Sequence, residues 1–396
     1  MRKISASYIF TGKGKLLKNG ILVIDDDGTV IDLIDTKGKL TEISSLEHYN
    51  GILCPGFVNA HCHLELSYMR GMLKKTSNIV GFVKQMFIKR GGYEGDIFEE
   101  IAKADKEMQL NGIVACGDIC NTEDSFLIKS KSKITYYNFI EVLGLKENQV
   151  SNKIEKAKQI ANEAINSNSG IVSITPHASY SVSIPLYYEI KQIAEDNKSI
   201  ISFHNQESKE EDELFVGEQN ELYKFLENFG LNKNTFPITN KSSFESIAQY
   251  LPQNNNILFV HNVFTNSNDI KSANKLFPNH YWVFCPKSNL YISNTLPNIE
   301  LFKNENDKIC IGTDSLATNN SLSVIDELKV LQNNFKNLSI EQLLQWATLN
   351  GAKALQMDNK TGSFEKGKKP GVNLIYDINL QALKLTEKTK VVTVQQ

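Results

Sequence analysis

Residues 56–66 have the sequence GFVNAHCHLEL, a short apolar run that ends in two histidines separated by one cysteine. Side chains of a β-strand alternate between its two faces, so His61 and His63 should point the same way and Cys62 the opposite way. Two imidazoles on one face can chelate a metal ion. A single histidine at a strand end is more often a packing residue, but the paired spacing favours a metal site.

Three more histidines end apolar stretches further along the chain: His177 in GIVSITPHASY, His204 in IISFHNQES and His261 in ILFVHNV. Histidine is the commonest metal ligand and the usual acid or base near neutral pH. The repeated placement at strand ends therefore predicts one metal-centred active site. The other two histidines, His48 and His280, lie in polar surroundings, where we expect them to be solvated.

The region after residue 53 predicts an α/β fold, because eight short apolar or β-branched runs alternate with stretches of helical composition such as 97–110, 153–165, 185–196 and 242–251. Eight such units are typical of the (β/α)₈ TIM barrel, whose catalytic residues gather at the C-terminal ends of the strands. The predicted strands are 56–64, 112–119, 134–142, 170–177, 200–207, 256–263, 281–287 and 308–314.

Both ends of the chain are rich in strand-like sequence. Residues 21–34 read ILVIDDDGTVIDLI, two strands around an Asp-Gly turn, and residues 362–396 contain GVNLIYDI and KVVTVQQ. We expect a small β-sandwich built from residues 1–53 and 362–396, with the barrel, residues 54–361, inserted between its halves.

Composition excludes several classes of function. The net charge of -2 and the pI near 6.4 indicate no basic surface for nucleic acid, and no run of like charges indicates membrane binding. Lysines such as Lys129, Lys131 and Lys133 are expected on solvated faces. The six cysteines show no C-x-x-C spacing, which favours reduced thiols and a cytoplasmic protein. The expected partner is a small-molecule substrate. The sequence does not decide whether the chain forms a homo-oligomer.

Six segments in order, PGFVNAHCHLE, PHASYSVS, HNQES, VHNVF, CPKSN and GTDSLATNNSL, resemble the successive signatures of the amidohydrolase superfamily. They are most similar to its branch of purine and heterocycle deaminases and chlorohydrolases, which includes aminodeoxyfutalosine, S-adenosylhomocysteine and guanine deaminases. The resemblance runs from the N-terminal segment to ATLNGAKAL at 347–355, and it implies a metal-dependent hydrolase of non-peptide carbon–nitrogen bonds.

The resemblance assigns His61, His63, His204 and Asp314 as ligands of one divalent metal ion. Three imidazoles and one carboxylate suit Zn²⁺, with Fe²⁺ or Mn²⁺ as alternatives. Some members of the superfamily hold two metals bridged by a carboxylated lysine on the fourth strand. That strand carries His177 and no lysine here, so we expect a single metal.

The resemblance also implies catalytic roles for Glu207, His261 and Asp314. Glu207 would carry protons to a ring nitrogen, His261 would stabilise the intermediate, and Asp314 would act as both ligand and base in a deamination that releases ammonia. The alternative for Glu207 is a solvated side chain, together with the acidic residues that follow it. In the softer motifs, Ser288, Asn289 and Asn319 could be supporting residues, turn residues or substrate contacts.

Substrate contacts are expected from His177, Glu65, Arg70 and Arg90. His177 ends the fourth strand, although it could instead be a capped loop histidine. Arginines bind carboxylates or phosphates with two hydrogen bonds, so Arg70 or Arg90 is a candidate for an anionic substrate group. The stretch LELS after the histidine pair resembles aminodeoxyfutalosine deaminases, whose substrate carries adenine, ribose and a benzoate, and Glu65 would then accept ribose hydroxyls.

Two alternative functions stay open at this level. Cyclic amides and chlorinated heterocycles are hydrolysed on the same fold, although Glu207 and His261 favour deamination. A scaffold without catalysis would hold no metal, so metal analysis distinguishes it, whereas cyclic amide hydrolysis would release no ammonia.

Overall fold

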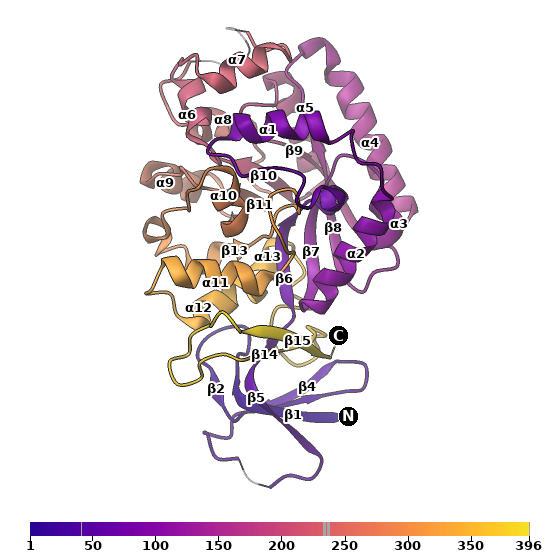
Figure 1. Cartoon of the computed structure of the whole chain (residues 1–396), viewed down its shortest axis with the longest axis vertical. Helices are drawn as coiled ribbons and strands as arrows, with labels where there is room; N and C mark the ends of the chain where they lie inside the picture. Colours follow the sequence, from indigo (N-terminus) through magenta and orange to yellow (C-terminus); the bar gives the residue numbers. More distant parts are fainter. Residues whose placement is uncertain (41, 233–234, 236–237, 396) are drawn as a thin grey trace.

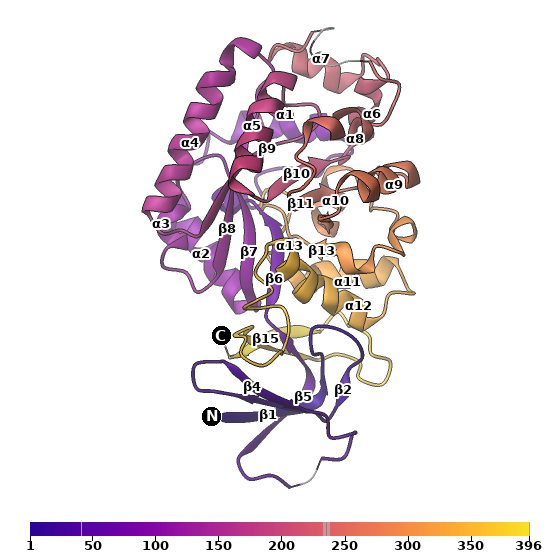
Figure 2. The same ribbon diagram turned by 180° about the vertical axis from the view of Figure 1, so that it is seen from behind.

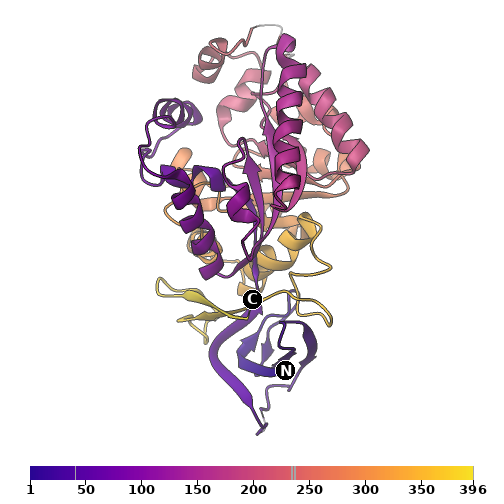
Figure 3. The same ribbon diagram turned by 90° about the vertical axis from the view of Figure 1, so that its right-hand side faces the viewer.

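The computed structural model describes residues 1–40, 42–232, 235 and 238–395. The described chain has two parts along its long axis (Figures 1 and 3). A β-sheet that contains both termini lies at one end, and a larger region of alternating strands and helices makes up the rest. Helix α7 lies at the end opposite the terminal sheet (Figure 1).

The larger region contains two four-stranded parallel sheets, in which each strand pairs with the next in the sequence. Their strands confirm the eight predicted runs, with ends displaced by a few residues. The first sheet comprises β6 (Phe57–Cys62), β7 (Ile113–Cys120), β8 (Thr135–Val142) and β9 (Ile171–Pro176), and the second β10 (Ile201–Asn205), β11 (Ile257–His261), β12 (His280–Phe284) and β13 (Ile309–Ile311).

Helical segments follow each of these strands; α4 packs against β8 and β9, and α5 packs against β9 (Figure 2). The helices are α1 (Ile79–Lys89), α2 (Ile97–Leu110), α3 (Phe126–Lys129), α4 (Val150–Asn166), α5 (Ile184–Asn197), α6 (Lys209–Phe215), α7 (Glu221–Glu227), α8 (Ser243–Ile247), α9 (Ser267–Leu276), α10 (Pro286–Ile292), α11 (Val324–Asn334), α12 (Ile340–Gln345) and α13 (Gly351–Ala354). Short 3₁₀ turns are η1 (Leu64–Met69), η2 (Glu147–Gln149), η3 (Ala248–Tyr250), η4 (Ile299–Phe302) and η5 (Asn306–Lys308), and η6 (Trp346–Asn350) is a π-helical turn.

The two parallel sheets meet at both of their edges. An isolated parallel bridge joins Cys62 on β6 to Asp314 after β13, and another joins Ala178 after β9 to His204 on β10. The backbone N–H of His204 donates to the carbonyl of His177 at 2.9 Å. The strands therefore have the arrangement of a TIM-barrel-type α/β fold, with the carboxyl ends of all eight strands on one side.

Strands from both termini share one mixed sheet of seven strands in the order β15-β14-β5-β1-β3-β4, with β2 paired to β1. The C-terminal β14 pairs antiparallel with β5, which leads directly into β6. Both termini thus contribute strands to one sheet, as expected, whereas the predicted sandwich stays a prediction. The strands are β1 (Arg2–Ile9), β2 (Leu17–Lys18), β3 (Ile21–Ile24), β4 (Val30–Ile34), β5 (Leu46–Pro55), β14 (Val372–Tyr376) and β15 (Lys390–Gln395).

Burial contradicts two of the sequence expectations. Lys129 was expected on a solvated face, but its side chain is fully buried and pairs with Asp118, whereas Lys131 and Lys133 are exposed as expected. His280 is 1% exposed at the start of β12, although its sequence neighbours are polar. All six cysteines are buried free thiols, as predicted. In the described chain, no helix combines the length and apolar character needed to cross a bilayer.

Candidate active site

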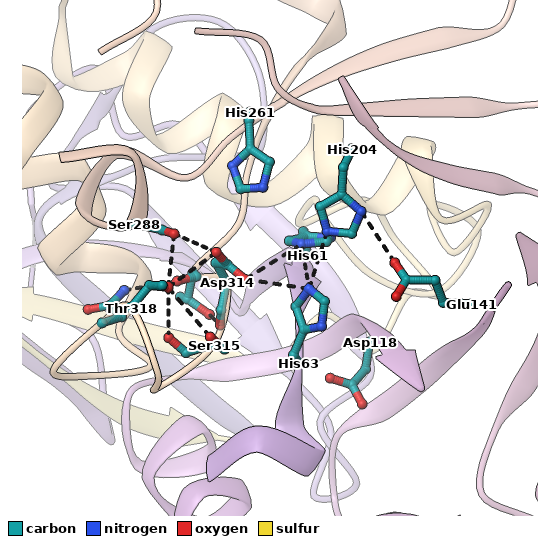
Figure 4. A network of polar contacts seen from close by, with 12 residues as sticks. His61, His63, Asp118, Glu141, His204, His261, Ser288, Asp314, Ser315 and Thr318 are labelled. Atoms are coloured by element: carbon teal, nitrogen blue, oxygen red, sulfur yellow. Dashed lines mark hydrogen bonds and ion pairs between the residues drawn. The ribbon is translucent and has the colours of Figure 1, made fainter. Parts of the chain in front are cut away.

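Three imidazoles and one carboxylate converge at the carboxyl ends of the strands (Figure 4). The Nε2 atom of His63 lies 3.2 Å from Nε2 of His61 and 3.3 Å from Nε2 of His204. The Oδ1 atom of Asp314 lies 3.5 Å from Nε2 of His63 and 3.8 Å from Nε2 of His61. His61 lies on β6 and His63 follows its last residue, Cys62, and both rings lie on the same side, as the spacing of two predicts.

These distances and donor atoms fit a bound metal ion. Ligand nitrogens about 2.0–2.1 Å from a tetrahedral zinc ion are about 3.3 Å apart, which matches the nitrogen separations in this cluster. Burial, followed by the neighbouring histidines, holds the pKa values of His61 and His204 well below the usual value. Both imidazoles are therefore neutral at neutral pH, the form in which histidine binds metals.

Asp314 is held in place by two hydroxyl groups. Its Oδ2 atom accepts hydrogen bonds from Ser288 Oγ and from Thr318 Oγ1, the latter at 3.2 Å, so Oδ1 remains directed at the imidazoles. The backbone of Asp314 has a φ of 57°, and that of His261 a φ of 77°. Left-handed conformations are unusual for residues other than glycine, and they cluster at functional sites, where the chain aims a side chain.

Glu207, His261 and Asp314 form a second cluster beside the three imidazoles, with one ligand-type atom of each residue within 4.8 Å of the others. Oε1 of Glu207 lies 3.5 Å from Nε2 of His261. Burial raises the pKa of Glu207 well above its usual value, and the carboxylates of Asp314 and Glu211 raise it further. Burial also lowers the pKa of His261 to about 3. These shifts favour the protonated form of Glu207 and leave His261 neutral at neutral pH.

The acidic residues after Glu207 are only partly solvated. Glu211 is 1% exposed, and its Oε1 accepts hydrogen bonds from the backbone N–H groups of Glu207 and Ser208 at 2.8 and 3.1 Å. Ser208 and Glu211 form the capping box of α6, which fixes the backbone that carries Glu207. This contact argues against the solvated alternative for Glu207.

A cavity of about 340 Å³ opens from this cluster, and its walls are largely apolar. Helix α1 and the segment around α7 supply most of the apolar side chains, including Phe82, Met86, Leu222, Phe225 and Phe229. The polar lining includes His63, His177, His204, Glu207, His261, Asp314, Glu141, Asn121 and Arg90. The segment after the first strand, which carries Arg90, thus forms one wall of the cavity.

The four expected substrate contacts differ in position. His177 and Arg90 line the cavity, whereas Arg70 and Glu65 are not among its described lining residues. Arg70 pairs with Glu107 and donates to the carbonyl of Asn320. Glu65 is buried beside the cavity, where Arg90 Nη2 lies 3.1 Å from its Oε1.

Several supporting residues were missed or only partly anticipated from the sequence. Ser288 and Asn289 proved to be partners of Asp314 and His261, since Nδ2 of Asn289 lies 3.0 Å from Nδ1 of His261. Glu141, at the end of β8, lies 3.3 Å from Nδ1 of His204 and was not anticipated. The sequence feature that could have indicated Glu141 is that it is the single acidic residue in the apolar run YYNFIEVLG.

Comparison with known proteins agrees with this geometry. An adenosine deaminase from Helicobacter pylori is 26% identical over 94% of this chain and 91% of its own length. An aminodeoxyfutalosine deaminase from Nitratiruptor sp. is 27% identical over 100% of this chain and 98% of its own. The crystal structure of H. pylori aminofutalosine deaminase in complex with methylthio-coformycin superposes with a TM-score of 0.81 at 23% identity, covering 95% of this chain and 92% of that one.

The family model of the amidohydrolase family matches residues 52–395. The match begins in β5 just before the His61–His63 strand and includes every residue of the two clusters, as well as the C-terminal strands of the terminal sheet. The converging imidazoles, the carboxylate after the last parallel strand and this match together show that the chain is a member of the amidohydrolase family.

Proposed function

We propose that the protein is a metal-dependent hydrolytic deaminase that removes the amino group of an adenine-type ring in an adenosine derivative and releases ammonia. The observation that carries the proposal is the position of Glu207, His261 and Asp314 beside three imidazoles at the floor of one cavity. The relatives described above are named as deaminases of adenosine-type substrates, which supports the same reaction.

His61, His63, His204 and Asp314 would hold one divalent metal ion, with zinc suggested by the nitrogen-rich donor set. When bound, such an ion lowers the pKa of a coordinated water and so supplies a nucleophile at neutral pH. The remaining chemistry belongs to side chains of this chain.

Glu207 is the proton donor in the proposed reaction. Burial raises the pKa of Glu207 and so favours its protonated form, which can donate to the ring nitrogen next to the amino-bearing carbon when water attacks that carbon. Asp314 Oδ1 takes a proton from the attacking water and returns it to the departing amino group. One carbon–oxygen bond forms and one carbon–nitrogen bond breaks. Ammonia leaves, and the second proton of the water passes to Glu207 as the product carbonyl forms.

His261 is the proposed donor to the developing negative oxygen. In the orientation observed, Asn289 Nδ2 donates to Nδ1 of His261, so the ring proton resides on Nε2, which faces Glu207. A neutral imidazole N–H placed in this way can stabilise charge that appears only in the transition state.

The proposal extends to the architecture and location of the protein. The bridges at both sheet edges support a closed (β/α)₈ barrel over residues 54–361, and the sheet shared by both termini supports a separate β-domain of residues 1–53 and 362–396, for which the sandwich form is part of the proposal. The six buried free thiols support the cytoplasm as the compartment.

The test is ammonia release by the purified, metal-loaded protein from adenine, adenosine, 5′-substituted adenosines, guanine and cytosine. We expect activity on adenosine derivatives and none on hydantoins or chlorinated triazines. Glu207→Gln should retain the metal and lose about 100-fold or more in kcat, as removal of a general acid typically does. Near-normal turnover by that variant, or a preference for hydantoins, would contradict the proposal.

A further inference from the structure

One carboxylate oxygen of Glu141, a residue of the cavity wall, is buried and accepts no hydrogen bond from the described part of the chain. Its side chain is 4% exposed, and it lines the cavity from the end of β8. Oε2 accepts a hydrogen bond from Asn121 Nδ2 at 3.0 Å, but Oε1 accepts none within the described part of the chain. A buried carboxylate oxygen without a donor is costly, so the site is built for a donor that the protein does not supply.

A histidine nitrogen near Oε1 has another hydrogen-bond partner. Nδ1 of His204 lies 3.3 Å from Oε1 of Glu141, yet its hydrogen-bond partner is the carbonyl oxygen of His177 at 3.2 Å. Figure 4 shows the Glu141 carboxylate beside Nδ1 of His204, while the opposite nitrogen of that ring faces His63. Oε1 therefore keeps free hydrogen-bonding capacity.

Glu65, the carboxylate expected to bind ribose, has no comparable capacity. Its Oε2 accepts hydrogen bonds from the backbone N–H groups of Asn121 and Thr122 and from Thr122 Oγ1, all within 3.0 Å. Its Oε1 pairs with Arg90. Glu65 thus anchors the loop after β7 and an arginine of the cavity wall, and Glu141 is the carboxylate with an oxygen left for a ligand.

His177 lies next to Glu141 on the same wall. Its ring centroid is 4.7 Å from that of His204, and its Nδ1 is 2.7 Å from Ser181 Oγ, so Nε2 is the ring nitrogen left for a ligand. One ring nitrogen of His177 and of His204 and one Glu141 oxygen lie within 4.8 Å of one another. A carboxylate and a neutral imidazole this close suit two neighbouring hydroxyl groups. One hydroxyl can donate to the carboxylate, and the other can donate to the imidazole nitrogen or accept from its N–H.

We infer that Glu141 Oε1 accepts a hydrogen bond from a sugar hydroxyl of the substrate, with His177 as its neighbour, and that this pair selects ribonucleosides over deoxyribonucleosides. The inference rests on the proposed function. With the amino-bearing carbon at the Glu207 cluster, the donors left on an adenosine derivative are its sugar hydroxyls, which must lie away from the reacting atoms. Glu141 is on the His204 side of the floor, separate from Glu207 and Asp314.

A cation shared by Glu141, His177 and His204 is the competing use of the same atoms. It is disfavoured because His204 would have to give up the Nδ1 proton that it donates to His177 while its Nε2 faces the first cluster. A neutral imidazole cannot offer both nitrogens as ligands.

The experiment compares kcat/KM of the metal-loaded enzyme for adenosine, 2′-deoxyadenosine and 3′-deoxyadenosine. It uses wild type, Glu141→Gln, Glu141→Leu and the exposed control Glu147→Gln. We expect wild type and the control to prefer adenosine over at least one deoxy substrate by about 10- to 100-fold, the range for a hydrogen bond to a charged group. Both Glu141 variants should lose most of this preference and retain the metal. Calorimetric binding of inosine and the corresponding deoxyinosine should show the same change without turnover.

The other outcomes separate the two proposals. Ammonia release with equal rates on deoxy substrates, or an unchanged preference in Glu141→Gln, overturns the role of Glu141 and leaves the deaminase standing. If the Glu141 variants lose kcat/KM equally on all substrates and also lose the metal, the role of Glu141 is to position His204 instead. If wild type binds two metal ions per chain and Glu141→Gln binds one, Glu141 is a ligand of a cation site. No ammonia from any nucleoside and no inosine binding overturn both proposals.

Discussion

Replacing Lys129 by Met should destabilise the protein strongly, although Lys129 lies outside the catalytic clusters. Its ammonium group is 2.5 Å from Asp118 Oδ2, and both side chains are fully buried. Nζ also donates to Asn138 Oδ1 at 2.7 Å. The variant would leave Asp118 as a buried carboxylate without its counter-charge. Removing one partner of a buried pair costs about 3–5 kcal/mol, because the remaining charge is uncompensated.

The effect should extend to the metal site through one hydrogen bond. Oδ1 of Asp118 accepts the backbone N–H of Leu64 at 2.7 Å, directly after His63. A displaced Asp118 would free this backbone, so the variant should also bind metal more weakly. Replacing both partners, as in Asp118→Asn with Lys129→Met, removes the buried charges together and should recover about 1–2 kcal/mol relative to Lys129→Met alone.

The assay is urea unfolding of the metal-free protein, followed by the fluorescence of Trp282 and Trp346, which are both buried, and by far-UV circular dichroism. Coincident transitions by the two probes are required before free energies are compared. Lys131→Met is the matched control, because Lys131 is exposed in the same segment and its loss should cost less than about 0.5 kcal/mol. A free energy of unfolding for Lys129→Met within about 1 kcal/mol of wild type would refute the reasoning.

Three further predictions concern single side chains. His204→Ala should lose the bound metal, since it removes one of three converging imidazoles; unchanged metal content by elemental analysis would refute its assignment as a ligand. Arg90→Ala should lower kcat/KM about 10-fold for substrates with a carboxylate arm and leave neutral nucleosides unaffected, as expected for a lost ion pair at a partly exposed site; equal losses on both classes would exclude an anion contact. Burial lowers the pKa of His280 to about 4. His280 therefore stays neutral in the folded state at pH values where the unfolded state, with a pKa of 6.5, binds a proton. Between pH 7 and pH 4, wild type should therefore lose up to about 3 kcal/mol more stability than His280→Asn, measured by urea unfolding at each pH; parallel pH profiles would contradict this.

The features that could be predicted from the sequence are those with a local periodic signal. Each parallel strand is a short apolar run between turn residues, and helix α2 occupies 97–110 as its apolar spacing predicts. The histidines at the strand ends could be assigned to one site because a parallel α/β fold brings the carboxyl ends of its strands together. Their convergence therefore followed from topology and needed no knowledge of side-chain packing.

The features that could not be predicted depend on partners distant in the sequence. Lys129 and Lys131 have similar sequence surroundings, yet only Lys129, at the end of α3, pairs with Asp118 on β7. His280 has polar neighbours along the chain but packs against Trp282 and Phe259. Glu65 and Glu141 look equally suited to bind a ligand, and only their contacts show that the first is occupied. Burial and pairing across strands carry this information, which local composition lacks.

The position of the ligands at the sheet edges explains why one ion could organise the whole fold. One edge contact is the bridge between Asp314 and Cys62, which lies between His61 and His63, and the other is the bridge that contains His204. Strand β6 and the residue after it supply His61 and His63, and β10 and the segment after β13 supply His204 and Asp314. These edges are otherwise joined by isolated bridges and few backbone hydrogen bonds. A bound cation would thus connect the two sheets where their own pairing is weakest, and its binding free energy would add to the stability of the native state.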